Sequence, residues 1–207
     1  LDEQGRVREA ELFPSFIRTT ERMSYTAVNA ILDGDETVRR RYRKIVPMIE
    51  LMAQCAQGIR RRRHDQGAIN FEKEEARILL DEHGRIRDIQ PRERREAERM
   101  IEDFMVCANE AVARYMKQLE FPCLYRIHEA PEAEKLRSFA GIVRLLGKQL
   151  KGSVDHIQPR QLQQLLESFE GEDEYPVVSM LMLRSMQKAK YDPHCLGHFG
   201  LALREYT

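Results

Sequence analysis

The sequence predicts an α+β, helix-rich fold in which several helices pack against short strands. Three observations support this prediction. Apolar residues recur every three or four positions over most of the chain, as they do in amphipathic helices. Only brief segments alternate apolar and polar residues as half-buried strands do. Three of the later helical segments carry a proline near their first turn, where a helix tolerates one: Pro131, Pro159 and Pro176.

In the first quarter of the chain, the pattern predicts one strand and two helices. After a turn at Gly5, alternation predicts a strand over Glu9–Thr19. A short amphipathic helix follows, with Ser24 as its N-cap and Gly34 as its stop. A longer helical pattern runs from Glu36 to about Arg63, and Pro47 either kinks this helix or opens its second half.

The middle and end of the chain read as a hairpin, further helices and two short strands. RILLDEHGRIRDI predicts a hairpin with strands over Arg77–Leu80 and Arg85–Ile89. The longest helix is expected from Pro91 or Arg92 to Leu119, and the stretch CLYRIHE predicts a short strand after it. The three proline-led helices follow. The final HFGLALREYT alternates again, which predicts a last strand.

Composition excludes fibrous and membrane-embedded proteins. The chain has 207 residues, of which 42% are hydrophobic and 33% charged, and its 34 Lys and Arg balance 34 Asp and Glu. Any nucleic-acid contact must therefore be local, because no overall basic field exists. No apolar run reaches the roughly 20 residues of a membrane helix. Four cysteines without a C-x-x-C pair predict reduced thiols and a cytoplasmic location.

Five stretches, in this order and spacing, resemble the catalytic domain of the ribonuclease R and ribonuclease II family of exoribonucleases, with ribonuclease R the closer match. They are IRTTERMSYTAVNAIL, GAINFEKEEARILLDEHGRI, MIEDFMVCANEAVARYM, LYRIHEAPEAEKLRSF and MLMLRSMQKAKYDPHCLGHFGLALREYT. The resemblance covers essentially the whole chain. It implies that residues 1–207 are an interior part of one ribonuclease II-type catalytic domain, truncated at both ends.

The resemblance implies a hydrolytic, processive 3′–5′ exoribonuclease that degrades single-stranded RNA to nucleoside 5′-monophosphates. Family members hold the catalytic Mg²⁺ with aspartates that lie upstream of this chain, so the metal site would belong to the parent enzyme and the segment alone is expected to be inactive. Cold-shock and S1 oligonucleotide-binding domains flank the catalytic domain in the family and are absent here. The competing hypothesis is a noncatalytic RNA-binding or protein-interaction module that keeps this fold.

The family motifs imply five substrate-binding residues. Phe71 would clamp the terminal base, although a Phe beside Ile69 is otherwise read as core. Tyr25 matches a tyrosine near the 3′-terminal nucleotide, and Glu102 an acidic residue that binds the terminal sugar. Two further matches are His128, expected to order a turn or line the channel rather than act as a base, and His198, close to the active centre.

Helix periodicity also separates Glu102 from its neighbour Asp103. On a helical wheel, Glu102 falls at the edge of the apolar stripe, whereas Asp103 lies with Glu110 on the opposite face. An edge position can face a cavity, whereas the opposite face meets solvent, so the wheel favours Glu102 over Asp103 as the functional carboxylate. A solvated carboxylate at the edge of the stripe is the alternative for Glu102. The run Arg60–Arg63 is expected to be either a solvated helix end or a phosphate contact.

Overall fold

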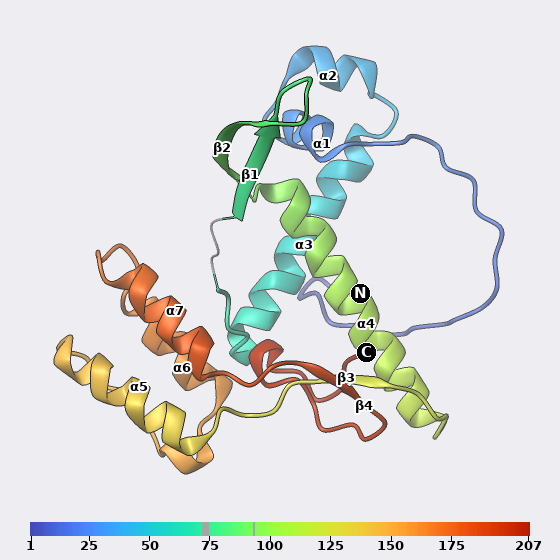
Figure 1. Ribbon diagram of the computed structural model, residues 1–207. Coiled ribbons are helices and arrows are strands. Elements are labelled where there is room, and N and C mark those ends of the chain that lie inside the picture. The colour runs from blue at the N-terminus through green and yellow to red at the C-terminus, as the bar shows by residue number, and fades with distance from the viewer. Residues whose placement is uncertain (72–74, 93) are drawn as a thin grey trace. The chain divides into compact units, whose positions relative to one another are not determined.

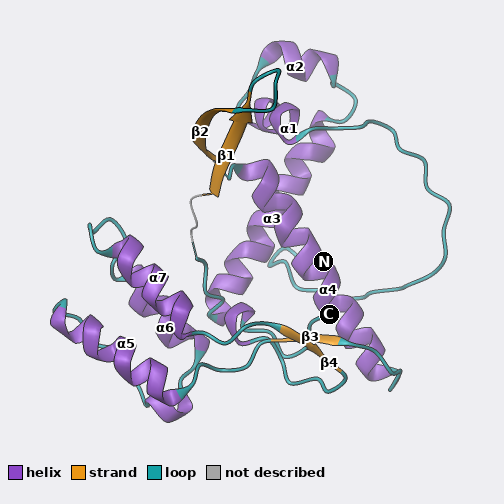
Figure 2. Cartoon of the chain, viewed as in Figure 1, coloured by secondary structure: helices purple, strands orange, loops and turns teal. Residues whose placement is uncertain are grey.

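The computed structural model describes residues 1–71, 75–92 and 94–207. Helices are the main regular structure of this part of the chain, and the strands form two small two-stranded sheets (Figures 1 and 2). The chain divides into two compact units. The larger unit comprises residues 1–12, 58–71 and 104–207, and the smaller comprises residues 13–57 and the described part of 72–103. The predicted helix-rich α+β class is confirmed.

The smaller unit begins with the predicted capped helix. Helix α1 (Tyr25–Leu32) starts after Ser24, whose hydroxyl accepts a hydrogen bond from the Ala27 N–H at 3.2 Å. The long helix expected next is two helices, α2 (Glu36–Arg41) and α3 (Val46–Gln66), separated by a turn. Pro47 is the second residue of α3, so it opens the second helix and does not kink a continuous one.

The predicted hairpin is present. Strands β1 (Glu75–Leu80) and β2 (Ile86–Arg92) pair antiparallel, with an irregular register next to Leu80. Because β2 continues through Arg92, helix α4 (Glu96–Gln118) begins later than predicted. The hairpin has only two strands, so Pro91 lies on an edge strand, where a missing backbone N–H is tolerated.

The larger unit is built on three helices that pack against one another, α5 (Ala133–Leu145), α6 (Pro159–Glu167) and α7 (Tyr175–Ser185), all visible in Figure 1. The short 3-10 helix η1 (Val154–His156) packs against α5. Their apolar faces share one core, which includes the fully buried Phe169. Burying each large side chain of this kind contributes about 1.5–3 kcal/mol.

The second sheet joins β3 (Tyr125–Ile127), which was predicted, to β4 (Lys190–Asp192), which was not. The strand predicted at the end of the chain is wrong. Phe199–Leu201 form the 3-10 helix η2, and Ala202 ends it in the left-handed conformation at φ 53°. Alternation of apolar residues over so few positions also fits a tight turn, which presents its side chains to two sides.

The strand predicted over Glu9–Thr19 is also wrong. Residues 6–24 form no helix or strand, as Figure 2 shows. The aromatic and aliphatic side chains of this segment stand in solvent, with Phe16 at 108% and Ile17 at 91% relative exposure. An alternating sequence becomes a strand only when a neighbouring strand takes its backbone hydrogen bonds. None of the four described strands pairs with this segment.

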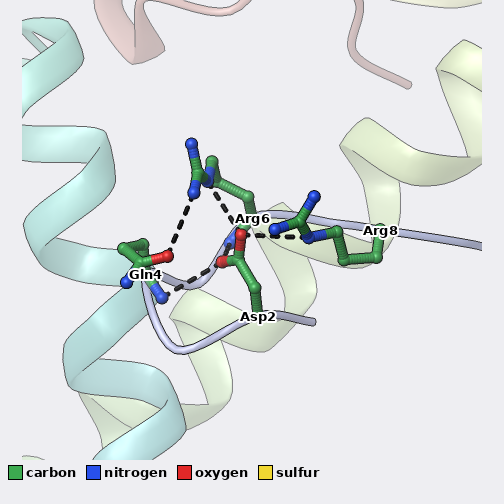
Figure 3. Close-up of polar contacts among 4 residues, drawn as sticks. All are labelled: Asp2, Gln4, Arg6 and Arg8. Atoms are coloured by element: carbon green, nitrogen blue, oxygen red, sulfur yellow. Dashed lines mark hydrogen bonds and ion pairs between the residues drawn. The ribbon is translucent and has the colours of Figure 1, made fainter.

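The predicted turn at Gly5 is confirmed and is stabilised by a polar cluster (Figure 3). The Asp2 carboxylate accepts hydrogen bonds from the backbone N–H groups of Gln4 and Arg6, at 3.1 and 2.8 Å, and pairs with Arg8 at 3.3 Å. The bond from the Arg6 N–H contributes most to lowering the pKa of Asp2. Gly5 has φ +70°, and a side chain there would collide with the α3 backbone at Ile59.

One arginine of the run at the end of α3 is internal to the larger unit. Arg62 donates to the Glu110 carboxylate of α4 at 2.9 Å, and Arg114 donates to the other oxygen of the same carboxylate at 2.8 Å. The side chains of Arg62 and Glu110 are 12% and 7% exposed. Arg62 therefore serves the packing of α3 on α4, and a phosphate contact does not explain it.

We predict that Gly67→Ala destabilises the protein more than Gly147→Ala. Both glycines have positive φ, +95° and +79°, but an added Cβ at Gly67 would lie 2.8 Å from the Arg160 Cα, whereas nothing lies within 4 Å of one at Gly147. Conformational strain alone costs about 1–2 kcal/mol, and the clash adds roughly 1–3 kcal/mol. Urea unfolding of both variants measures the difference, and equal losses would contradict this account of Gly67.

Candidate functional site

Tyr25 lies at the rim of an apolar cavity in the smaller unit. The cavity has a volume of about 830 Å³, and its wall includes Met48, Met52 and Met100. Tyr25 is the first residue of α1 and is 44% exposed, so its ring and hydroxyl are accessible. Ile101, the residue before Glu102, lines the same cavity from α4. Methionine side chains are flexible and polarisable, and they suit a surface that adapts to a planar ring.

A single buried amide holds α1 against the start of α4. The Asn29 side chain is 3% exposed in α1. Its oxygen accepts a hydrogen bond from the Ala97 N–H at 2.9 Å, and its NH₂ donates to the Glu98 carboxylate at 3.1 Å. The Ala97 N–H belongs to the first turn of α4, where a helix has no internal acceptor for it. Asn29 therefore fixes the distance between the elements that carry Tyr25 and Glu102.

Glu102 is held by an arginine that precedes α4. Arg94 forms an ion pair with the Glu102 carboxylate, and the two side chains are 32% and 41% exposed. The oxygens of this carboxylate are hydrogen-bond acceptors. Its second oxygen has no protein partner among the hydrogen bonds described for this residue. The group is suited to ligands that present hydroxyl donors.

The wheel's assignment of solvent to Asp103 is wrong. Asp103 is 3% exposed and Glu110 is 6% exposed, so both acids are on the buried face of α4. The apolar side chains of Ile101 and Met105, on the same helix, are exposed instead. The wheel predicted the wrong buried face because α4 is covered partly through polar contacts, such as the Arg62–Glu110 ion pair. Of the adjacent acids, only Glu102 is accessible.

In the larger unit, the structure places His128 and His198 side by side. Their ring centroids are 5.0 Å apart, and the two residues share a parallel bridge of backbone. The Gly200 N–H donates to His128 Nδ1 at 2.9 Å, so that atom carries no proton. The ring proton is then on Nε2, which donates to the Gln187 carbonyl at 2.8 Å. Both ring nitrogens of His128 are occupied in fixing the backbone.

His198 is a neutral imidazole that caps a turn. Its Nδ1 accepts the Leu201 N–H at 3.2 Å at the start of η2, and its ring meets Tyr206 edge-on with centroids 5.3 Å apart. Burial above all, together with the neighbouring His128 and Arg126, lowers the pKa of His198 to about 4. Both histidines line a cavity of about 1010 Å³, together with Arg160 and Arg204.

Phe71 is in the larger unit but is not part of this cavity wall. It is half-buried and packs against the core of α5–α7, as does Phe199. Two residues earlier, the Ile69 N–H donates to the Gly200 carbonyl at 3.0 Å. The Phe71 segment is therefore attached by its backbone to the turn that His128 fixes.

The five predicted residues divide between the two units. Tyr25 and Glu102 lie in the smaller unit, and Phe71, His128 and His198 in the larger. Sequence reasoning missed Asn29 and Arg94. The one available signal was a polar residue, Asn29, among the buried positions of a short helix.

The described residues offer neither a metal cluster nor a membrane span. No three His, Cys, Asp or Glu residues among them gather closely enough to hold an ion. No described helix is both long and apolar enough to cross a bilayer.

Comparison with known proteins gives one consistent family. The model of the RNB domain matches residues 1–207. Ribonuclease R of Aquifex aeolicus is 38% identical over 206 residues, a match that covers 100% of this chain and 29% of that protein. Ribonuclease R 1 of Lactococcus lactis is 40% identical over 204 residues, with 99% and 25% covered. The chain thus spans less than a third of the length of these relatives.

A solved structure supports the same conclusion for the fold. RNase R of Mycoplasma genitalium, in complex with ribose-methylated single-stranded RNA, superposes with a TM-score of 0.90 at 28% sequence identity. The match covers 99% of this chain and 32% of that one. The bound RNA is a property of that protein.

We predict that acid destabilises the protein partly through His198. Its folded pKa of about 4 lies below the ordinary 6.5, so the unfolded chain takes up the proton first as pH falls. The stability that the neutral ring contributes is complete above pH 6.5 and is lost between about pH 6.5 and 4. His198→Asn keeps an acceptor for the Leu201 N–H without titrating in this range.

The free energy of unfolding should therefore fall less steeply with acid in His198→Asn than in the wild type. His83→Asn, in the exposed turn of the hairpin, is the control and should follow the wild type. Parallel pH profiles for wild type and His198→Asn would show that the His198 ring does not titrate as described.

We predict that Asn29→Ala lowers the free energy of unfolding by about 1–3 kcal/mol, because it leaves the buried Ala97 N–H without an acceptor. Thr26→Ala, on the exposed face of the same helix, is the matched control and should change stability by less than about 0.5 kcal/mol. Chemical denaturation gives both values. If Asn29→Ala lowers the free energy of unfolding no more than Thr26→Ala does, the Asn29 side chain does not stabilise the contact between α1 and α4.

Proposed function

Because this chain belongs to the RNB domain family, we propose that the whole protein is a hydrolytic, processive exoribonuclease. It degrades single-stranded RNA from the 3′ end and releases nucleoside 5′-monophosphates. The observation that carries the proposal is the match of residues 1–207, without a gap at either end, to one family of ribonucleases. The proposal includes a cytoplasmic location, which the four free cysteines support.

In this proposal, Glu102 and Tyr25 recognise the terminal ribose. The 2′- and 3′-hydroxyl groups are hydrogen-bond donors, and an ionised carboxylate is the acceptor they need. Arg94 holds the Glu102 carboxylate in place, and the accessible Tyr25 hydroxyl can both donate and accept. DNA lacks the 2′-hydroxyl and would leave one hydrogen bond of the site unmade, so the same pair favours RNA.

Phe71 clamps the terminal base in this proposal. Stacking of a base on an aromatic ring is worth about 1–3 kcal/mol and tolerates any base, which suits an enzyme that degrades RNA of any sequence. The Phe71 side chain is half-buried and packs against the core, which holds the ring in a fixed orientation. A rigid ring loses little conformational entropy when a base stacks on it.

His128 and His198 shape the substrate cavity in this proposal and take no proton from water. Each uses Nδ1 to accept a backbone N–H, and His128 also commits Nε2 to a carbonyl. The hydrolysis is Mg²⁺-dependent in this proposal, and Mg²⁺, when bound, activates the attacking water. Its ligands would be carboxylates other than those described here, so residues 1–207 alone would bind RNA without cleaving it. Cold-shock and S1 domains are the proposed neighbours in the whole protein.

We predict that Glu102→Gln in the full-length protein slows degradation of single-stranded RNA by roughly 10- to 100-fold, the value of one hydrogen bond to a charged group. The substitution should slow degradation less for a substrate whose terminal sugar is deoxyribose, because that sugar makes one hydrogen bond fewer to Glu102. Release of nucleoside monophosphates from labelled oligonucleotides in the presence of Mg²⁺ measures both rates. Glu170→Gln, an exposed acid of the larger unit, is the control and should leave both rates unchanged.

Arg94→Gln should reproduce part of the Glu102→Gln effect, since it leaves the carboxylate in place but unsupported. If Glu102→Gln discriminates between ribose and deoxyribose as the wild type does, Glu102 does not bind the sugar. A wild-type protein that binds RNA and never cleaves it would replace the exonuclease by a noncatalytic RNA-binding module.

A further inference from the structure

Four cations form an exposed patch on the smaller unit, at the end of α2 and in the turn before α3. We call it the α2 patch, and its residues are Arg40, Arg41, Arg43 and Lys44. The acids of this stretch, Asp35 and Glu36, lie at the other end of α2. The whole chain has a net charge of zero, so this concentration of positive charge is a local feature of the surface.

The backbone beneath the patch is ordered. The Asp35 carboxylate caps α2 by accepting the N–H groups of Thr37 and Val38, at 2.9 and 3.0 Å. The turn continues with hydrogen bonds from Tyr42 to the Val38 carbonyl at 3.0 Å and from Ile45 to the Tyr42 carbonyl at 2.9 Å. Ile45 is buried and anchors the turn. The cations are therefore presented from a fixed surface, which reduces the entropy lost on binding.

The patch differs from the arginine just before it. Arg39 points inward, donating to the Ile31 carbonyl at 2.9 Å and to Glu50 at 2.7 Å, so its charge is used within the unit. In the described part of the chain, no carboxylate forms an ion pair with Arg40, Arg43 or Lys44. Arg41 lies over the Tyr42 ring at 5.2 Å, which leaves the N–H edge of its guanidinium available.

We infer that the α2 patch binds the phosphate backbone of the RNA substrate, at nucleotides further from the 3′ end than those at Tyr25 and Glu102. The inference rests on the proposed function and extends it. Three of the four cations are arginines, whose planar forks match phosphate oxygens. Helix α1, which begins at Tyr25, packs against α2, so the patch and the sugar site belong to one unit.

The test is the salt dependence of RNA binding by the full-length protein without Mg²⁺. Fluorescence anisotropy would compare a single-stranded RNA of roughly 25 nucleotides with one of about four, a length that fills only the terminal site. The variant replaces all four patch residues by alanine. The matched control replaces three other exposed arginines and one lysine by alanine: Arg85, Arg87, Arg144 and Lys151.

For the long RNA, the patch variant should bind roughly 10- to 100-fold more weakly near 50 mM salt, and the slope of log affinity against log salt should fall by about 2 to 3. Binding of the short RNA should be unchanged, and the control should keep most of the wild-type slope. These results would support the patch as a phosphate site.

Other outcomes would overturn the inference. A wild-type slope in the patch variant, or an equal loss in the control, would show that the patch makes no specific contribution. Binding of the patch to vesicles that contain phosphatidylserine, with RNA binding unaffected, would assign it to a membrane. If the wild type binds neither RNA, the proposed function fails. If the wild type binds both RNAs and the patch variant keeps the wild-type salt slope for the long RNA, only this inference fails.

Discussion

The hydrogen bond from the Gly200 N–H to the neutral Nδ1 of His128 is the interaction on which the larger unit's candidate site depends. Gly200 also accepts the Ile69 N–H through its carbonyl, so one residue joins the end of β3 to the segment that carries Phe71. An added Cβ at Gly200 would lie 3.2 Å from His128 Nδ1, which leaves no room for a larger residue without movement of the ring. Ring protonation would remove the acceptor and break the connection.

In both units, therefore, a side chain accepts a backbone N–H of a helix's first turn: that of α4 in the smaller unit and that of η2 in the larger. In the smaller unit the acceptor is the Asn29 amide, 68 residues from its partner Ala97. In the larger unit the acceptors are imidazoles, His128 and His198. The difference matters because an amide keeps its acceptor at every physiological pH, whereas an imidazole loses it when protonated. Acid therefore leaves the Asn29 acceptor in place, whereas it removes the acceptor that His198 offers to the Leu201 N–H.

The sequence predicted the elements whose hydrophobic period is supported by a local stop or start signal. Helix α1 has Ser24 before it and Gly34 after it, α6 begins at Pro159, and α7 has Pro176 as its second residue. The prediction over Glu9–Thr19 was wrong because a strand needs a partner, which local alternation does not reveal. Two polar contacts were not predicted for a related reason. Asn29 bonds to Ala97, which is distant in sequence, and Arg94 lies outside the helix that carries its partner Glu102. The candidate roles of Tyr25, Phe71 and Glu102 came from family resemblance alone, and they stay predictions.

The buried ion pair between Arg62 and Glu110 limits how α3 and α4 can slide on each other in the larger unit. Two apolar helix faces can shift by one turn, about 5.4 Å, and exchange one set of contacts for a similar set. A shift of this size would separate the Glu110 carboxylate from Arg62 and leave a buried charge without its partner, at a cost of several kcal/mol. The pair thus selects one alignment of the two helices among several that hydrophobic packing alone would accept.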